Sequence, residues 1–315
     1  MINAHVRESI LATLERLNSV FIGQLDDEEL TIGLQRVTVP NIDSDAFREV
    51  IVNAFAHRDY ARLGTVRVTW YPDALEISNP GGLVDGVSVS NILTAPPTPR
   101  NFALADALKR LGLAERSGRG VDRIFEGQVR YGRLPPDYSG TTPTQVVVRL
   151  QRGPADRAFV SAIAEYEIRT GGRLPVPETI ALAALRRTGR LSTAELAVHL
   201  QVSESRARLV ADDLVAAHLA LPHGRTRAHF YTLSEHFLAA LGAPRVLSAL
   251  AGLSEVEQEA TIISMASTGQ RITRAAVTQR CGLTGEQAKY RLRRMVEDGL
   301  LKKAGKGPAT HYLLA

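Results

Sequence analysis

The chain has 315 residues, of which 44% are hydrophobic and 5% aromatic; this composition excludes a disordered tail and is typical of a globular protein with about two domains. The formal net charge of +5 favours a polyanionic partner. Cys281 is the single cysteine, which excludes an internal disulfide and a zinc–thiolate cluster, and because we find neither a membrane-length apolar run nor a secretory signal, we expect a cytoplasmic protein with no membrane partner.

Hydrophobic periodicity and turn residues define the elements expected in the first 82 residues. They are, in order, a helix within residues 6–17, an acidic turn at 26–29, a strand over 36–39, a helix that starts after Asp43 or Ser44, and a hairpin of strands 65–71 and 74–78. The hairpin runs into Asn79-Pro80-Gly81-Gly82, where the glycines permit a sharp turn and the close approach of a ligand.

The helix after Ser44 carries a carboxylate and a carboxamide four residues apart. Glu49 and Asn53 therefore project from one side of this helix. A carboxylate can orient or deprotonate a water molecule, and an amide oxygen can complete a magnesium shell shared with phosphate oxygens. The alternative for such a short motif is a solvated helix face. His57, four residues after Asn53, either points into the same site or hydrogen-bonds the next hairpin.

Residues 83–100 are expected to form a long loop of the kind that acts as a lid or binding segment, since Pro96, Pro97 and Pro99 prevent regular structure. Asn101 caps a helix that Gly112 closes. The run Glu-Arg-Ser-Gly-Arg-Gly at 115–120 then opens a helix over 121–130, which is the layout of an anion site; the alternative is a helix end and turn. Residues 145–150 form a buried strand.

This order of motifs resembles the gyrase, histidine kinase and MutL class of ATPases (GHKL, the Bergerat fold). More closely, E-x-x-x-N-A-x-x-H-R-D-Y at 49–60, E-I-S-N-P-G-G at 76–82 and S-G-R-G-V at 117–121 are similar to the ATPase-like domain of bacterial proteins labelled RecG-related or transcriptional regulators. The resemblance covers residues 36–150 and implies ATP and magnesium as cofactors. Proteins of this family often carry another domain before the ATPase-like part, so the chain is either a fragment or a natural short form.

The resemblance implies a role for each matching residue. Glu49 would be the general base or the water-positioning carboxylate, and Asn53 would be the magnesium ligand. The implied cofactor-binding residues are Asn53, Asn79, Gly81, Gly82, Ser117, Gly118, Arg119, Gly120, Thr141 and Thr142. The class usually has an aspartate where this chain has Asn79, and an asparagine accepts a hydrogen bond without the charge that roughly doubles its strength. The sequence therefore leaves two alternatives for this domain: it recognises adenine and hydrolyses ATP weakly with magnesium, or it does neither.

The second half contains an internal repeat. A linker helix, from about 156 to 170, and a loop are expected at 153–177. After them, a shift of 81 residues aligns 191–233 with 272–314 without a gap. Each copy is expected to form helices followed by a two-stranded ribbon with a basic tip, in domains 178–240 and 245–315. This pattern resembles the winged helix-turn-helix, in which the third helix enters the DNA major groove and the wing contacts the backbone. Winged helices also serve as dimerisation modules, and that alternative stays open.

The predicted DNA contacts are the cationic, amide and hydroxyl side chains of each third helix and wing. In the first copy they are Ser203, Ser205, Arg206, Arg208, Arg225 and Arg227; in the second they are Thr284, Gln287, Lys289, Tyr290, Arg293, Arg294, Lys302, Lys303 and Lys306.

We therefore expect an α+β protein in which a Bergerat-type sandwich of residues 1–152, with a mixed sheet and helices on one face, precedes two winged helices. The predicted function is a homodimeric, double-stranded-DNA-binding transcriptional regulator in which nucleotide at the first domain controls winged-helix docking. The alternative is a DNA-binding or dimerisation protein with a vestigial nucleotide site. A helicase is excluded by the lack of a G-x-x-x-x-G-K-[ST] loop.

Overall fold

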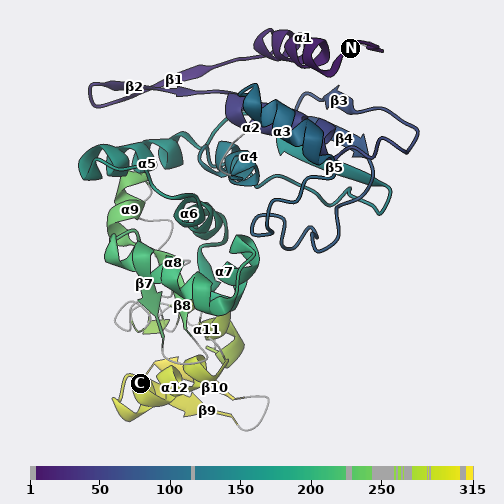
Figure 1. The fold of residues 1–315 in the computed structure, drawn as a ribbon. Helices are drawn as coiled ribbons and strands as arrows, with labels where there is room; N and C mark the ends of the chain where they lie inside the picture. Colours follow the sequence, from purple (N-terminus) through teal and green to yellow (C-terminus); the bar gives the residue numbers. More distant parts are fainter. Residues whose placement is uncertain are drawn as a thin grey trace. The chain divides into compact units, whose positions relative to one another are not determined.

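The computed structural model describes residues 5–114, 118–224, 229–242, 259, 262–263, 265, 272–281, 283, 285–305 and 310–314. The protein has an α+β fold with two compact units, Met1–Leu241 and Gly242–Ala315 (Figure 1). Ser117, Arg225, Arg227, Thr284 and Lys306, which were predicted as contact residues, lie outside the described residues.

A three-stranded sheet forms the centre of the N-terminal unit. Its strands β3 (Arg67–Trp70), β4 (Ala74–Pro80) and β5 (Gln145–Gln151) pair antiparallel in the order β3-β4-β5. The family resemblance led us to expect a mixed sheet. Both strand pairs of this sheet are antiparallel, and an isolated parallel bridge joins Gly81 to Gln145. Strand β4 is buried on both faces because it is the central strand, and it extends two residues beyond the predicted end.

Helix α2 (Ser44–His57) packs on β4 and carries Glu49 and Asn53. The Asp43 side chain caps it by accepting a hydrogen bond from the Ala46 N–H at 2.9 Å. Helix α4 (Gly120–Val129) packs closely beside α2, since a methyl group at Gly127 would lie 2.7 Å from the Ala46 Cβ. This contact brings the start of α4 next to the polar face of α2.

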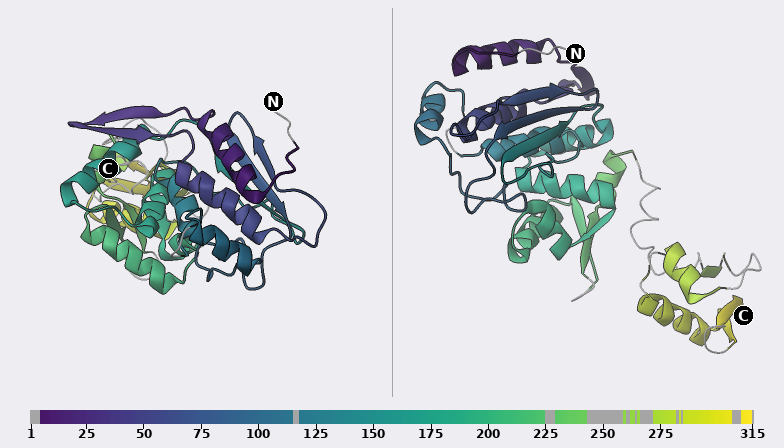
Figure 2. Two further views of the ribbon diagram at one scale, coloured as in Figure 1. Left: turned by 45° about the horizontal axis from the view of Figure 1, so that its top comes forward. Right: turned by 90° about the vertical axis from the view of Figure 1, so that its right-hand side faces the viewer.

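Further elements surround this centre. Helix α1 (Ile10–Ile22) packs on α2 (Figure 2). The rings of Phe21 and Phe47 stack there with centroids 4.0 Å apart. Helix α3 (Phe102–Arg110) packs on the other end of α2. Strands β1 (Glu28–Ile32) and β2 (Gln35–Val39) form a hairpin. The acidic residues 28 and 29, predicted as part of a turn, begin β1, because pairing with β2 outweighs the low strand propensity of glutamate.

Residues 153–177, the predicted linker helix and loop, are part of the N-terminal unit. Its helix α5 (Arg157–Thr170) contacts β1 through an ion pair between Arg157 and Glu28, and contacts α9 (Glu235–Ala240) through an edge-to-face pair of Phe159 and Phe237. The ATPase-like region and the first copy of the repeat therefore belong to one compact unit.

We call the first copy module A, residues 176–233. It contains α6 (Val176–Thr188), β6 (Arg190–Ser192), α7 (Thr193–Leu200), α8 (Glu204–Ala216), β7 (Ala220–His223) and β8 (Phe230–Leu233). Helix α6 packs against α4, and this contact attaches module A to the part of the unit that contains α2 and the three-stranded sheet.

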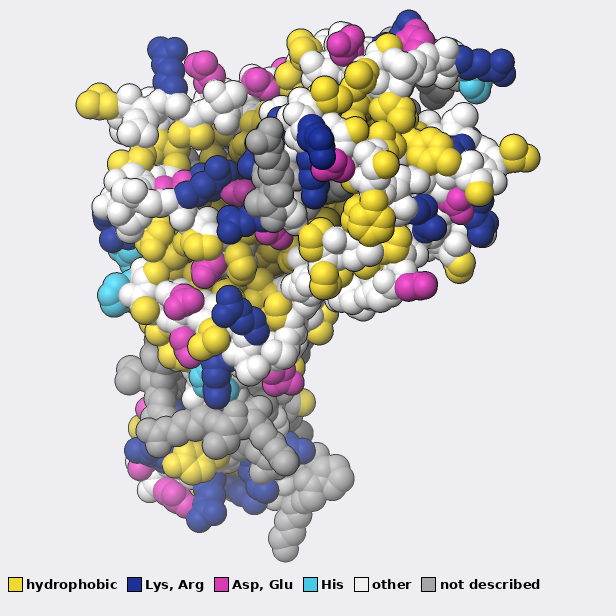
Figure 3. Space-filling model, viewed as in Figure 1, with side chains coloured by type: hydrophobic (Ala, Val, Ile, Leu, Met, Phe, Trp, Pro, Cys, Tyr) yellow, Lys and Arg dark blue, Asp and Glu magenta, His cyan; other side chains and the backbone are white. Residues whose placement is uncertain are grey.

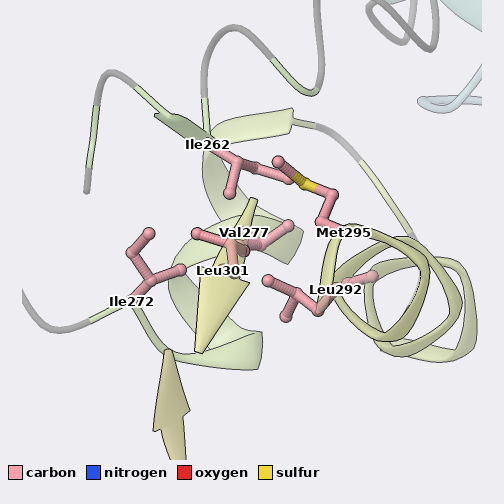
Figure 4. Close-up of a cluster of buried hydrophobic side chains, with 7 residues drawn as sticks. Ile262, Ile272, Val277, Leu292, Met295 and Leu301 are labelled. Atoms are coloured by element: carbon pink, nitrogen blue, oxygen red, sulfur yellow. The ribbon is translucent and has the colours of Figure 1, made fainter. Parts of the chain in front are cut away.

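We call the second copy module B, residues 272–314. Its elements are α11 (Arg274–Cys281), α12 (Gly285–Glu297), β9 (Leu301–Ala304) and β10 (His311–Leu314). Each begins and ends 81 residues after its counterpart, as from 193 to 274 and from 204 to 285, and the Leu191–Tyr231 pair recurs as the Ile272–Tyr312 bridge. Ile272, Val277, Leu292, Met295 and Leu301 of module B form a buried core together with Ile262, which precedes the module in the chain (Figure 4).

Within the described part of the chain, no helix is long and apolar enough to cross a membrane.

Candidate functional site

The N-terminal unit contains a cavity of about 190 Å³. Helix α2 forms one wall, strands β4 and β5 form the floor, α4 and α3 form the far side, and the loop of residues 83–100 covers it. The side chains of Ile77, Val146 and Val148 give the floor an apolar surface. The lining polar and glycine residues are Glu49, Asn53, His57, Asn79, Gly82, Thr98, Lys109, Gly118, Gly120 and Tyr138.

Glu49 and Asn53 both line the cavity from α2, as their spacing predicts. The Glu49 side chain is only 2% exposed, and its Oε1 lies 4.0 Å from Nη2 of Arg48. Asn53 is half-buried. A buried carboxylate beside a carboxamide gives this wall one group that can accept a proton and one neutral oxygen ligand.

The start of α4 lies against these two side chains. A methyl group at Gly120 would lie 2.7 Å from Oε2 of Glu49 and 3.8 Å from Nδ2 of Asn53, so only glycine fits here without moving the carboxylate. Gly118 has a φ of +76°, which glycine adopts without strain, and it lies against Pro97 of the covering loop. Arg119, the residue at the N-cap position of α4, makes no side-chain hydrogen bond to the first turn of the helix.

Asn79 lies at the floor of the cavity and is 4% exposed. Its Nδ2 donates a hydrogen bond of 3.2 Å to the Pro80 carbonyl oxygen, and this bond fixes which end of the amide is the donor. The Oδ1 atom of this amide is chemically able to accept a hydrogen bond from an amino group.

His57 and Arg100 connect the end of α2 to the glycine turn. The Arg100 Nε donates to the His57 carbonyl oxygen at 3.1 Å, and its Nη2 donates to the Gly82 carbonyl oxygen at 2.9 Å. Burial, and to a smaller extent the Arg100 charge, lowers the pKa of the His57 imidazole from its usual 6.5. His57 therefore contributes a neutral ring to the cavity wall at neutral pH.

Several predicted binding residues do not line the cavity. Gly81 serves the turn, because its φ is +94° and a methyl group there would lie 2.7 Å from the Asp59 Cβ. The Thr141 hydroxyl donates to the Val147 carbonyl oxygen at 3.0 Å and accepts from the Val147 N–H at 3.1 Å. Thr142 is 3.2 Å from the Thr144 hydroxyl, and Arg119 is exposed. The structure thus brings together Glu49, Asn53, Asn79, Gly82, Gly118 and Gly120.

Lys109 and Tyr138 were not predicted from the sequence and do line the cavity. Lys109 follows Ala105 by four residues on α3, and Ala105 is a buried lining residue, so helical periodicity places both on the inner face. That spacing was the available signal for Lys109. Tyr138 is 7% exposed, and burial raises the pKa of its phenol.

The predicted contacts of the third helices and wings in the two modules are exposed where their side chains are described. In module A these are Ser203, Ser205, Arg206 and Arg208; in module B they are Lys289, Tyr290, Arg293, Arg294, Lys302 and Lys303. Gln287 lies in α12, but its side chain is not among those that the structure describes.

Residues 64–150 match a family described as "Putative ATP-dependent DNA helicase recG C-terminal", and this match supports an ATPase-like domain. It includes Asn79, Gly82, Gly118 and Gly120, whereas Glu49 and Asn53 precede it.

The DIP2311 protein from Corynebacterium diphtheriae has a similar fold, with a TM-score of 0.62 and 23% sequence identity. The similarity covers 98% of this chain and 54% of that protein, so the chain spans about half the length of its structural relative. No curated protein matches the chain.

Proposed function

We propose that the cavity of the N-terminal unit binds ATP with magnesium, and that modules A and B are winged helices that contact double-stranded DNA under the control of that nucleotide. The observation that carries the proposal is the position of Glu49 and Asn53 opposite the glycine-bearing start of α4, in one cavity. The N–H groups at the start of a helix bind phosphate, and carboxylate and amide oxygens suit magnesium.

The residues present fit a magnesium-nucleotide. The apolar floor made by Ile77, Val146 and Val148 suits the faces of a purine base, with the Asn79 Oδ1 as an acceptor for its amino group. At the other end, Asn53 would hold the metal, and the start of α4 would bind the phosphates. Bound magnesium would neutralise phosphate charge there.

The same geometry gives this chain's residues their roles in weak hydrolysis. Glu49 orients a water molecule and accepts its proton, because its buried carboxylate lies beside Gly120 at the phosphate end. The loop of residues 83–100 lines the cavity and would limit the access of bulk water to bound nucleotide.

Module B supports the DNA part of the proposal through its charge. Helix α12 has four basic and two acidic residues, whereas α8 of module A has two basic and three acidic ones. Figure 3 shows Lys and Arg side chains gathered on the C-terminal unit, and the exposed ones include Lys289, Arg293 and Arg294 of α12 and Lys302 and Lys303 of β9. Such a surface attracts phosphate backbones. Paired half-sites would be bound by a homodimer.

One observation favours a second function, that of a DNA-binding or dimerisation protein with a vestigial nucleotide site. Asn79 stands where the family resemblance leads us to expect an aspartate, and a neutral acceptor binds an adenine amino group more weakly.

Equilibrium dialysis of the full chain with labelled ATP tests the nucleotide site. We expect one saturable site that is lost when EDTA removes magnesium, and no retention under either condition would refute the proposal. Gel-shift titration with double-stranded DNA, with and without magnesium-ATP, separates the two functions. The proposed regulator changes its DNA affinity with ATP, whereas a protein with a vestigial site gives identical curves.

A further inference from the structure

Among the residues that the structure describes, the loop of residues 83–100 is hydrogen-bonded to module A through Gln201, in the turn between α7 and α8. The Leu93 N–H donates to the Gln201 Oε1 at 2.8 Å, and the Gln201 Nε2 donates to the Val89 carbonyl oxygen at 3.2 Å. The Thr94 hydroxyl donates to the Gln201 carbonyl oxygen at 2.9 Å. Gln201 thus contacts residues 89–94 of the loop through both ends of its side-chain amide and through its main-chain carbonyl group.

That stretch also covers the cavity. Val87, Ile92 and Ala95 line the cavity, and Val89, Leu93 and Thr94, which are hydrogen-bonded to Gln201, lie among them in the loop. This segment therefore connects the cavity to module A directly. Movement of the loop away from the cavity requires the Gln201 hydrogen bonds to break or to move with it.

The turn itself does not need a glutamine. Gln201 has a φ of +56° in the left-handed region, where glycine is the least strained residue. In module B the sequence has Gly282 at the position 81 residues after Gln201. Likewise His218, which has a φ of +58° in module A, corresponds to Gly299 in module B. The amide of Gln201 is therefore specific to the module that contacts the loop.

We propose that Gln201 is a positioning residue for the nucleotide site, which holds the loop of residues 83–100 closed over the cavity and so slows the release of bound nucleotide. This inference rests on the proposed function, because it requires the cavity to bind nucleotide. It assigns to module A a role in the nucleotide site that does not depend on DNA.

Two matched glycine substitutions in the full chain test the inference. Gln201→Gly removes both side-chain hydrogen bonds and relieves the left-handed backbone, so it leaves the fold intact. His218→Gly relieves the same strain in the same module without touching the loop, and it is the control. Thr94→Val removes the third hydrogen bond while keeping the side-chain volume.

The measurements are the amide exchange rate of Leu93 in the nucleotide-free protein and the dissociation rate of magnesium-ATP. Because two net hydrogen bonds are lost, we expect both rates to rise at least about fivefold in Gln201→Gly. We expect a smaller rise in Thr94→Val and no change in His218→Gly.

The outcomes separate this inference from the proposed function. If the wild type binds magnesium-ATP and Gln201→Gly releases it at the wild-type rate, the positioning role is wrong and the nucleotide site stands. An unchanged Leu93 exchange rate in Gln201→Gly also overturns the role. If the wild type binds no nucleotide, the proposed function fails, and with it the assignment of Gln201 to a nucleotide site.

Discussion

Glu49 is the residue on which the proposed hydrolysis depends. It is 2% exposed and lies beside the start of α4, so its carboxylate is held where phosphates are proposed to bind. Glu49→Gln keeps the size of the side chain and removes the proton acceptor. We expect it to bind magnesium-ATP like the wild type and to lose about 10²- to 10⁴-fold in hydrolysis rate. Phosphate release at the wild-type rate in this variant would show that Glu49 is not the base.

Gly120 tests the close contact between α4 and Glu49. Gly120→Ala places a methyl group 2.7 Å from the Glu49 Oε2, so the buried carboxylate must move. We expect weaker binding of magnesium-ATP. Gly285→Ala is the matched control, because Gly285 is the first residue of α12 and has open space around its Cβ position. The control should bind like the wild type and change the free energy of unfolding by less than about 1 kcal/mol. Equal affinities in both variants would contradict the contact.

The pKa of His57 predicts a pH dependence of stability. Because burial lowers the pKa of the folded-state imidazole from 6.5, the unfolded chain binds a proton that the folded chain does not. The free energy of unfolding should therefore be highest above pH 6.5 and fall as the pH drops below it. Burial also lowers the pKa values of His199 and His223.

Denaturant titrations above pH 6.5 and about one unit below it measure this effect. The loss of stability should be smaller in His57→Gln than in the wild type. A loss of the same size in both proteins would show that His57 is not one of the groups responsible.

At the residue scale, the sequence predicted which side chains lie together where the spacing of residues along a helix decides it. Glu49 and Asn53 line one cavity because residues four apart share a helix face. The sequence did not show that the Thr141 hydroxyl is hydrogen-bonded to the main chain of Val147 in β5. That pairing depends on a register set by tertiary contacts. Gly81 looked like a ligand contact and serves a turn, because glycine has the same signature in both.

At the scale of elements, the repeat was the strongest signal, since helices and strands of modules A and B share their bounds at one offset. Strand β1 was missed because its charged residues suggested a turn. Glycine and proline residues, which mark turns, delimit the linker helix and loop predicted at 153–177, and α5 is the helix of that segment. The contacts that place α5 in the N-terminal unit join residues far apart in sequence, so the sequence could not show them.

The charge difference between the third helices gives a prediction at the same scale. Arg208 in α8 and Lys289 in α12 occupy equivalent positions of the repeat and are both exposed. Lys289→Gln should weaken DNA binding and reduce the slope of log affinity against log salt by about 1. Arg208→Gln should change both less, because α8 has more acidic than basic residues. Equal effects at the two positions would show that both modules contact DNA alike.

At the scale of the whole molecule, the two compact units divide the proposed functions. The N-terminal unit, Met1–Leu241, contains both the cavity and module A, and the loop of residues 83–100 is hydrogen-bonded to that module. The more basic helix α12 belongs to the other unit, Gly242–Ala315. If the cavity binds nucleotide as proposed, the hydrogen bonds of Gln201 would connect the nucleotide site to module A. The sequence could not show this connection, because Gln201 and Leu93 are far apart in the chain.

The central claim is that the cavity beside Glu49 and Asn53 binds magnesium-ATP. Isothermal titration calorimetry of the full chain, wild type and Asn53→Ala, tests it most directly. We predict a saturable heat with one site per chain for the wild type, and an affinity at least about tenfold lower for Asn53→Ala, because the metal loses a ligand. No heat from either protein, or equal affinities in the two, would contradict the claim.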